Sequence, residues 1–254
     1  MEWIIIAAIL QGVLEWLPVS SSGQVSLYYI HIAGLSPGEA YRASVALHLG
    51  TALGAIAALR GEVLDAALRG PWLRVALIPM LAGAPVGLAV MNSVEGAPGD
   101  TVNVLIGVGL IVTGFLVRAK GSGGRSVEEL GATELAAIGI LQGLAAIPGL
   151  SRSAVTIAGL LAVGLRPGDA VRASIVMGIP VTMAAGFYEA ARGGLSLSLP
   201  EAVLGLAVAG LAGALSAGAM VGLARRVGWS LSLFLIMLGI LVLAPYAPLV
   251  LNPL

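Results

Sequence analysis

The chain has 254 residues, of which 58% are hydrophobic and only 10% are charged, and its formal net charge is zero. A soluble domain carries about 25% charged residues, so this composition excludes an ordinary soluble protein, and nothing in the charge balance indicates a nucleic-acid partner. The sequence contains no cysteine, which excludes disulfides and thiolate metal sites. We expect an all-α integral membrane protein whose residues 1–254 form one membrane domain.

Two apolar regions of the chain are interrupted in the middle, and six others are continuous. The interrupted regions are 3–34 and 135–165, which are broken at LPVSSSG and at IPGLSRS. Each of their limbs is about 10 to 15 residues long, which is typical of a re-entrant helical hairpin, because a crossing helix needs about 20 apolar residues. The continuous stretches are predicted transmembrane helices, at 43–59, 73–94, 101–117, 171–188, 202–224 and 229–247.

The two interrupted regions resemble each other in sequence. Ile-Leu-Gln-Gly at 9–12 recurs at 140–143, and LSPGEAYRAS at 35–44 recurs as LRPGDAVRAS at 165–174. The pattern predicts an internal duplication, with repeat one at about 3–117 and repeat two at about 135–247. Three predicted crossings separate the two hairpins, and an odd number inverts the second repeat relative to the first. Inverted repeats with broken helices are a layout that builds a polar site inside a bilayer.

Basic residues are distributed unequally between the two sides of this topology. Ten fall on one side and two, Arg42 and Arg192, on the other. Because cytoplasmic loops carry the excess of Lys and Arg, we expect a multi-pass cell-membrane protein with cytoplasmic basic loops and both termini external. The ten are Arg60, Arg69, Arg74, Arg118, Lys120, Arg125, Arg166, Arg172, Arg225 and Arg226.

One further cation, Arg152, lies in the second hairpin, and a carboxylate, Glu15, lies in the first. An arginine within the bilayer costs about 2.5–3.5 kcal/mol on insertion scales, so it needs a partner or a ligand. One interpretation is a structural ion pair between the two residues. The other is an anion site, since hydroxyl side chains and two helix N-termini accompany the arginine and phosphate matches its forked donors. The hydroxyl residues are Ser20, Ser21, Ser22, Ser151, Ser153 and Thr156.

The stretches EWLPVSSSGQ and IPGLSRSAVTIAGLL resemble the two signature motifs of the undecaprenyl-diphosphate phosphatase (bacitracin-resistance) family. The resemblance extends over nearly the whole chain, including LHLGT at 47–51. It implies removal of one phosphate from a C55 polyprenyl diphosphate, which regenerates the lipid carrier for cell-envelope glycan synthesis. It also implies that Glu15, Ser21 and Arg152 occupy catalytic positions and that Gln11 occupies a variable Glu/Gln position.

The sequence departs from the family motif at one position, because Gln24 stands where the motif ends in His. An amide neither accepts a proton at neutral pH nor attacks phosphorus, so Gln24 is left as a phosphate-binding candidate beside Gln11 and the hydroxyl residues. Of the two histidines, His48 is the better auxiliary candidate and His31 is expected to be a buried or interfacial residue. With Gln11 in place of a second carboxylate, a Mg²⁺ or Ca²⁺ site is only weakly indicated, although Mg²⁺ can be shared with substrate phosphates.

Two functions from different classes fit this sequence. In the first, a phosphatase, Arg152 holds the diphosphate and Glu15 acts as base, either on Ser21 or on water. In the second, a polyprenyl-phosphate binding protein or flippase uses the same site without hydrolysis, because inverted repeats are also transporter architecture. The sequence favours the phosphatase, leaves the two attack routes open, and leaves a homodimer open as well.

Overall fold

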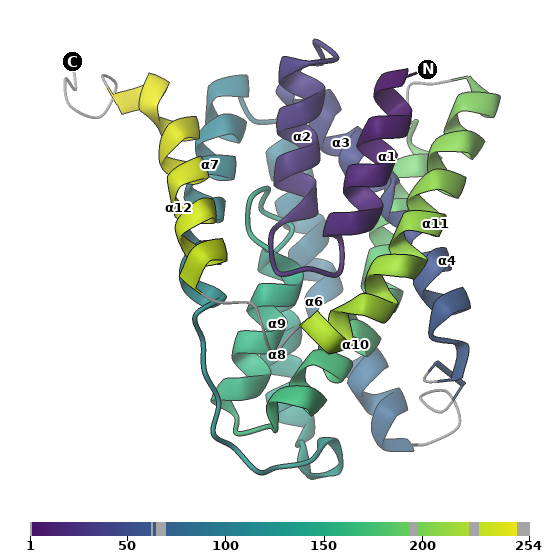
Figure 1. Cartoon of the computed structure of the whole chain (residues 1–254), viewed down its shortest axis with the longest axis vertical. Helices are drawn as coiled ribbons and strands as arrows, with labels where there is room; N and C mark the ends of the chain where they lie inside the picture. Colours follow the sequence, from purple (N-terminus) through teal and green to yellow (C-terminus); the bar gives the residue numbers. More distant parts are fainter. Residues whose placement is uncertain (1, 62, 65–69, 194–197, 224–228, 248–254) are drawn as a thin grey trace.

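The computed structural model describes residues 2–61, 63–64, 70–193, 198–223 and 229–247 (Figure 1). These parts of the chain are helical and contain no strand, in agreement with the all-α prediction. The helices are α1 (Glu2–Leu14), α2 (Ser21–His31), α3 (Pro37–Ala46), α4 (His48–Ala58), α6 (Gly70–Glu95), α7 (Gly99–Leu116), α8 (Ala132–Leu144), α9 (Arg152–Ala162), α10 (Pro167–Ala191), α11 (Leu199–Leu223) and α12 (Trp229–Leu243), with short 3₁₀ turns at Val127–Glu129 and Ala244–Tyr246.

Four helices are long and apolar enough to cross a membrane: α6, α7, α10 and α11. Their outer surfaces are apolar as well, since Leu81 is 70% exposed and Leu215 is 78% exposed. Large exposed apolar surfaces are unfavourable in water and are expected where a helix faces lipid. The prediction of a multi-pass membrane protein is confirmed at this level.

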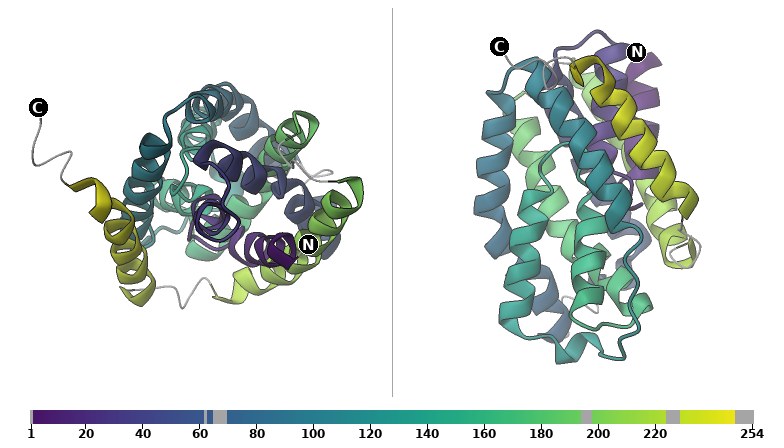
Figure 2. Two further views of the ribbon diagram at one scale, coloured as in Figure 1. Left: turned by 90° about the horizontal axis from the view of Figure 1, so that it is seen from above. Right: turned by 90° about the vertical axis from the view of Figure 1, so that its left-hand side faces the viewer.

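Two helical hairpins, α1–α2 and α8–α9, enter the bundle from opposite ends (Figure 1). We call the end at which α1 begins the α1 end and the end at which α8 begins the α8 end. The loops of both hairpins lie inside the bundle, between the two ends. Seen from above, α2 lies within the ring of helices, whereas α12 lies at its edge beside α7 (Figure 2).

Glycines allow the hairpin helices to approach their neighbours closely. A Cβ atom on Gly83 of α6 would meet the carbonyl oxygen of Gly139 in α8, and one on Gly12 of α1 would meet Ala212 in α11. Lipid offers no hydrophobic driving force between helices, so close packing of backbones is a main source of helix association in membranes. The first limb of each hairpin is therefore fixed against a long helix of the other repeat.

The stretch 43–59, expected to be one crossing, differs from the prediction because it belongs to two helices. Helix α3 ends at Ala46 and α4 begins at His48, with Leu47 between them. The backbone tightens there into a 3₁₀-type turn, in which the Gly50 N–H donates to the Leu47 carbonyl over 3.1 Å. The turn places His48 at the centre of the bundle, as described below.

Some of the segments between the helices can be placed at one end of the bundle or the other. The segments 117–131 and 163–166 lie at the α8 end, whereas the segments 32–36 and 96–98 lie at the α1 end. Arg42 and Arg192 are neighbours, since the Arg42 guanidinium donates to the Arg192 carbonyl over 3.3 Å. Three of the counted cations, Arg69, Arg225 and Arg226, lie outside the described residues.

Candidate active site

The loop of the first hairpin joins α1 to α2 through a turn at residues 15–19, followed by Ser20. Its last residue, Ser20, has φ 60° and ψ 80°, the left-handed conformation that side chains other than Gly seldom adopt. The Gln24 amide holds the turn from the first turn of α2, because its Nε2 donates to the Val19 carbonyl over 2.6 Å. The result is a tight loop that brings the N-terminus of α2 back toward the end of α1.

The loop of the second hairpin joins α8 to α9 and is held by α7. Gly149 has φ 92°, and a Cβ atom there would meet the carbonyl oxygen of Ile106 in α7. The Thr113 hydroxyl of α7 donates to the Gly149 carbonyl over 2.9 Å and accepts from the Ser151 N–H over 2.8 Å. Ser151 in turn caps α9, since its hydroxyl accepts from the Ala154 N–H over 3.3 Å.

The two loops touch each other at the middle of the bundle. The Ser153 hydroxyl donates to the Leu17 carbonyl over 2.9 Å, and a Cβ atom on Gly23 would lie 2.8 Å from Gly149. The Tyr41 hydroxyl of α3 donates to the Ala146 carbonyl over 2.6 Å and joins the second hairpin to the first repeat. These contacts fix the first turns of α2 and α9 relative to each other.

The Glu15 carboxylate lies at the centre of this contact and is only 6% exposed. Its Oε2 accepts from the Ser21 hydroxyl over 2.7 Å and from the Gln11 amide over 2.8 Å. Its Oε1 accepts from the Arg152 guanidinium over 3.0 Å and from the Thr182 hydroxyl over 3.4 Å. A buried carboxylate is stable only when paired and hydrogen-bonded, and this one receives donors from four helices.

The Arg152 side chain crosses from α9 to Glu15. Its NH1 donates to the Ser174 carbonyl over 3.2 Å, and its guanidinium carbon lies 5.1 Å from the centre of the Trp16 ring. On the other side the guanidinium lies against Gly178 of α10, where any Cβ atom would overlap it. The arginine is thus held between an aromatic face, a backbone and a carboxylate, and its planar group is fixed in orientation.

His48 is another nitrogen-bearing side chain that closely approaches Glu15. Its Nε2 lies 3.2 Å from Glu15 Oε2, and its Nδ1 lies 3.0 Å from the Ser44 carbonyl oxygen. Both ring nitrogens therefore lie near an oxygen atom. The Gln11 amide nitrogen lies farther away, 3.4 Å from Nδ1.

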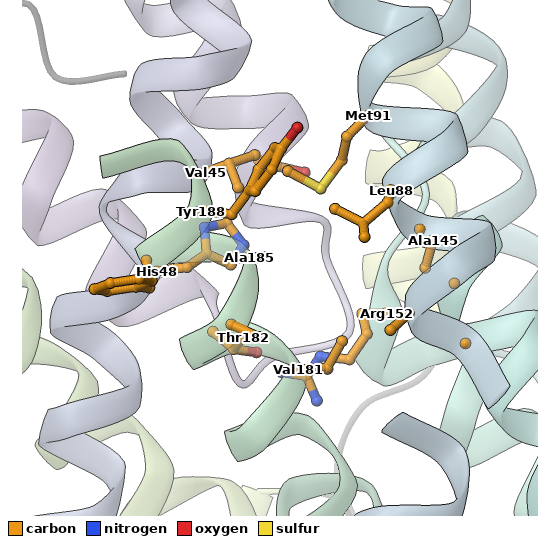
Figure 3. A pocket seen from close by; sticks show the side chains of 18 of the residues that line it. Val45, His48, Leu88, Met91, Ala145, Arg152, Val181, Thr182, Ala185 and Tyr188 are labelled. Atoms are coloured by element: carbon orange, nitrogen blue, oxygen red, sulfur yellow. The ribbon is translucent and has the colours of Figure 1, made fainter. Parts of the chain in front are cut away.

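A cavity of about 470 Å³ adjoins this polar centre (Figure 3). Glu15, His48, Arg152 and Thr182 line its inner part, and most of the remaining wall is formed by apolar or small side chains of α6, α8 and α10. Its lining continues along α10 to Tyr188 and Arg192 near the α1 end. The cavity therefore combines a polar inner end with an apolar wall, which suits a ligand with a charged head and an aliphatic tail.

A cluster of ion pairs lies where the cavity approaches the α1 end. Glu95 of α6 pairs with Arg42 over 3.1 Å and with Arg192 over 2.8 Å. Glu189 of α10, only 1% exposed, lies 3.6 Å from Arg42 and 4.0 Å from Arg192. Two carboxylates and two guanidiniums thus join α3, α6 and α10 at this end.

The structure brings together Gln11, Glu15, Ser21, His48 and Arg152 among the residues that the sequence singled out. Ser22 also lines the cavity. The remaining candidates form contacts within and between the hairpins: Gln24 with Val19, Ser151 with Ala154 and Thr113, Ser153 with Leu17, and Thr156 with Ser174, whereas the buried Ser20 hydroxyl has no partner in the described part of the chain.

Three residues around the site were not among the sequence candidates. Trp16 and Thr182 contact Arg152 and Glu15, and Gln142 lines the cavity. Gln142 could have been found from the sequence, because it matches Gln11 in the duplicated Ile-Leu-Gln-Gly. No sequence pattern distinguishes Thr182 from other polar residues of an apolar helix.

The donor set does not fit a resident divalent metal ion. Among the described residues, no three His, Cys, Asp or Glu side chains form a group that could hold one. Glu15 is the carboxylate at the centre, and its two oxygens already accept from Gln11, Ser21, Arg152 and Thr182. Mg²⁺ and Ca²⁺ need several oxygen ligands, which one occupied carboxylate does not supply.

The chain is similar to known proteins over most of its length. The family described as bacitracin resistance protein BacA matches residues 4–241. A protein of Methanothrix thermoacetophila named undecaprenyl-diphosphatase is 33% identical over 92% of this chain and 93% of its own length. Proteins of the same name from Methanopyrus kandleri and Haloarcula marismortui are 32% and 34% identical, over 96% and 88% of this chain and 95% and 89% of their own lengths.

Proposed function

Because the chain belongs to the bacitracin resistance protein BacA family, we propose that it hydrolyses a polyprenyl diphosphate of the undecaprenyl type. The products are the lipid monophosphate and inorganic phosphate, so the reaction returns a lipid carrier to cell-envelope glycan synthesis. The observation that carries the proposal is the contact of Glu15, Ser21 and Arg152 at the polar end of an apolar cavity.

Binding of the diphosphate is assigned to Arg152 and to the N-termini of α2 and α9. These helices begin at Ser21 and at Arg152, so their free N–H groups lie beside the same centre. Helix N-termini and a guanidinium favour the doubly charged phosphate chain and the charge that develops during transfer. The apolar cavity wall accepts the first isoprene units, and the rest of the tail lies in lipid.

Chemistry is assigned to Ser21 and Glu15. The Ser21 hydroxyl already donates to Glu15 over 2.7 Å, so the carboxylate accepts the hydroxyl proton as Ser21 Oγ attacks the terminal phosphorus. The new bond joins Oγ to phosphorus, and the bond that breaks joins phosphorus to the bridging oxygen, which leaves with the lipid monophosphate. Water then cleaves the phosphoserine, releases inorganic phosphate and restores the serine proton.

His48 and Thr182 support Glu15 in this scheme. Both contact its carboxylate, and neither lies within hydrogen-bonding distance of Ser21 in the contacts described above. They hold the carboxylate so that Oε2 remains directed at the serine. Any Mg²⁺ or Ca²⁺ that takes part would be shared with the substrate phosphates, because the described residues include no group of three or more His, Cys, Asp or Glu that could hold it.

We further propose that six crossings and two re-entrant hairpins form the membrane domain, with the α1 end external. The six comprise the four long helices, the α3–α4 pair and α12, and the distribution of basic residues supports the orientation. Cysteines introduced at Ser122 and at the C-terminal end are probed in intact cells with an impermeant thiol reagent. Labelling only at the C-terminal end is expected, and labelling at Ser122 alone contradicts the inverted arrangement.

Phosphate release from undecaprenyl diphosphate by the purified protein tests the function. We expect release by the wild type and none by Glu15→Gln, with substrate binding retained in the variant because Arg152 and the helix N-termini remain. A wild type that binds the lipid diphosphate and releases no phosphate would instead support the carrier function. The names of the relatives do not favour that alternative.

A further inference from the structure

Gln142 of α8 is a buried amide with nothing to bond to in the described protein. Its side chain is 3% exposed, and neither Nε2 nor Oε1 has a hydrogen-bond partner among the described residues. Leaving such a group unpaired is unfavourable, and the glutamine amide offers two N–H donors and an acceptor oxygen. The fold keeps a costly polar group where an apolar side chain of the same size would cost less.

The matching residue of repeat one shows what this amide is suited to bind. Gln11 donates through Nε2 to the Glu15 carboxylate, four residues farther along the same chain. The residue four positions after Gln142 is Ala146, which has no acceptor in its side chain. Repeat two therefore keeps the amide, but it lacks the carboxylate oxygen that accepts from the matching amide of Gln11 in repeat one.

Gln142 also faces the space where such an oxygen could come from a ligand. It lines the cavity together with Arg152, and its neighbours in that wall are Gly83, Gly87 and Gly143. The amide itself is buried, and the cavity wall beside it consists of glycines, in a lining that also includes Arg152 and the apolar residues. That position corresponds to the junction between the head and the tail of a lipid diphosphate.

We propose that Gln142 binds the phosphate that remains on the lipid. The proposal rests on the proposed function and assigns the two phosphates to the two hairpins. The transferred phosphate has to reach Ser21 in hairpin α1–α2, so the lipid-linked phosphate lies toward hairpin α8–α9 and accepts from Gln142 Nε2. An amide donor to a phosphate oxygen forms a charge-assisted hydrogen bond and adds no charge to the site.

Gln142→Met is the informative variant, because methionine has nearly the same length and shape and no amide. We expect its KM for undecaprenyl diphosphate to rise about 10- to 100-fold with kcat within about threefold of wild type. Inhibition by undecaprenyl monophosphate should weaken by the same factor, whereas inhibition by inorganic phosphate should stay unchanged. The midpoint of thermal unfolding in detergent should stay the same or rise, because an unpaired buried amide has been removed.

Asn103→Leu provides the matched control. Asn103 of α7 donates to the Tyr246 hydroxyl over 2.8 Å and is not part of the cavity wall. Removing this amide should lower the unfolding midpoint and leave KM unchanged, the opposite of the result at Gln142.

The outcomes separate the two proposals. A wild type that releases no phosphate contradicts the proposed function itself. An active wild type together with an unchanged KM in Gln142→Met contradicts the role of Gln142 alone. The same holds if inhibition by inorganic phosphate weakens in place of inhibition by the monophosphate, or if KM rises only together with a loss of stability.

Discussion

The hairpins of the two repeats share the helix–loop–helix layout and carry different side chains at the site. When Pro18 is matched with Pro148, Ser21 corresponds to Ser151, and Ser22 corresponds to Arg152. The first pair keeps the hydroxyl, but the two serines have different partners. Ser21 donates to the Glu15 carboxylate, whereas Ser151 caps the helix that follows it.

The repeated stretches 35–44 and 165–174 are offset by 130 residues, and the same offset pairs His48 with Gly178, each four positions after the end of its stretch. In repeat one the imidazole fills this position and contacts Glu15. In repeat two Gly178 has no side chain, and the Arg152 guanidinium occupies the space beside it. In the proposed mechanism one repeat supplies the nucleophile and the base, and the other supplies Arg152 together with the space that holds its guanidinium.

The contacts that build the scaffold are alike in the two repeats. Ser26 donates to Ser44 over 3.2 Å, and the matching pair Thr156 and Ser174 lies 2.7 Å apart. Each pair joins the second limb of a hairpin to the helix that follows it. The comparison teaches that a symmetric framework carries an asymmetric site, so matched substitutions in the two repeats should have unequal effects.

The largest inequality is expected between Ser21→Ala and Ser151→Ala. Loss of the attacking hydroxyl should lower kcat about 1,000-fold or more, with the protein still folded. Loss of the Ser151 hydroxyl should lower the free energy of unfolding by about 1 kcal/mol, because it removes a helix cap, and leave kcat within about threefold. Phosphate release and thermal unfolding of both variants, purified in parallel, measure the difference. Equal losses of kcat would mean that the two hairpins share the chemistry.

The next largest effect is expected at Arg152. Arg152→Lys keeps the charge and loses the planar fork that reaches Glu15 and Ser174 together, so we expect kcat/KM to fall about 100-fold. Arg172→Lys is the control, since Arg172 is an exposed arginine near the start of α10 and should tolerate the change. Membrane insertion is checked by the yield of folded protein. Wild-type activity in Arg152→Lys combined with an inactive Arg172→Ala would show that the anion site lies elsewhere.

A smaller effect is expected from Gly178→Ala. The substitution adds a Cβ atom at the position where repeat one has the His48 side chain. The added Cβ would overlap the Arg152 guanidinium, so the arginine must shift, and a shift of about 1 Å in a positioning group costs about 10- to 100-fold in rate. Gly168→Ala in the same helix is the control, because a Cβ atom there has no neighbour within 4 Å. Activity assays should show a loss only at Gly178. An unaffected Gly178→Ala would mean that the position of the guanidinium does not limit turnover.

The sequence predicted the parts of the fold and site that depend on local pattern. The Pro and Ser interruptions marked both hairpins, and the resemblance placed Glu15, Ser21 and Arg152 together, as their contacts show. The division of 43–59 at Leu47 was missed because neither Pro nor Gly occupies the break. A turn of this kind is set by packing of the helix on both sides and leaves no mark in hydropathy.

Residues that reach the site from a long helix could not be predicted for a similar reason. Thr182 contacts Glu15, and Gly178 contacts Arg152. Both contacts depend on how α10 is rotated about its axis, and the packing of neighbouring helices sets that rotation. In a helix that is apolar all around, no amphipathic face reveals that rotation. The sequence shows that Gln142 repeats Gln11 in the duplicated Ile-Leu-Gln-Gly. Only the structure shows that its side-chain amide has no hydrogen-bond partner among the described residues.

The smallest effect is expected at Gln24, and it follows from how the two hairpin turns are held. In repeat two Ser151 caps α9 directly, whereas in repeat one the residue before α2, Ser20, makes no side-chain cap. The Gln24 amide compensates by donating to the Val19 carbonyl, which is a structural contact and needs no proton transfer. Because Glu15 takes the Ser21 proton, Gln24→His should leave kcat within about threefold of wild type or raise it. Phosphate release by the two proteins, measured side by side at neutral pH, tests this. If the wild type released no phosphate and only Gln24→His did, Glu15 would not suffice as the base, and the chain would be a lipid-diphosphate binding protein built on a phosphatase framework.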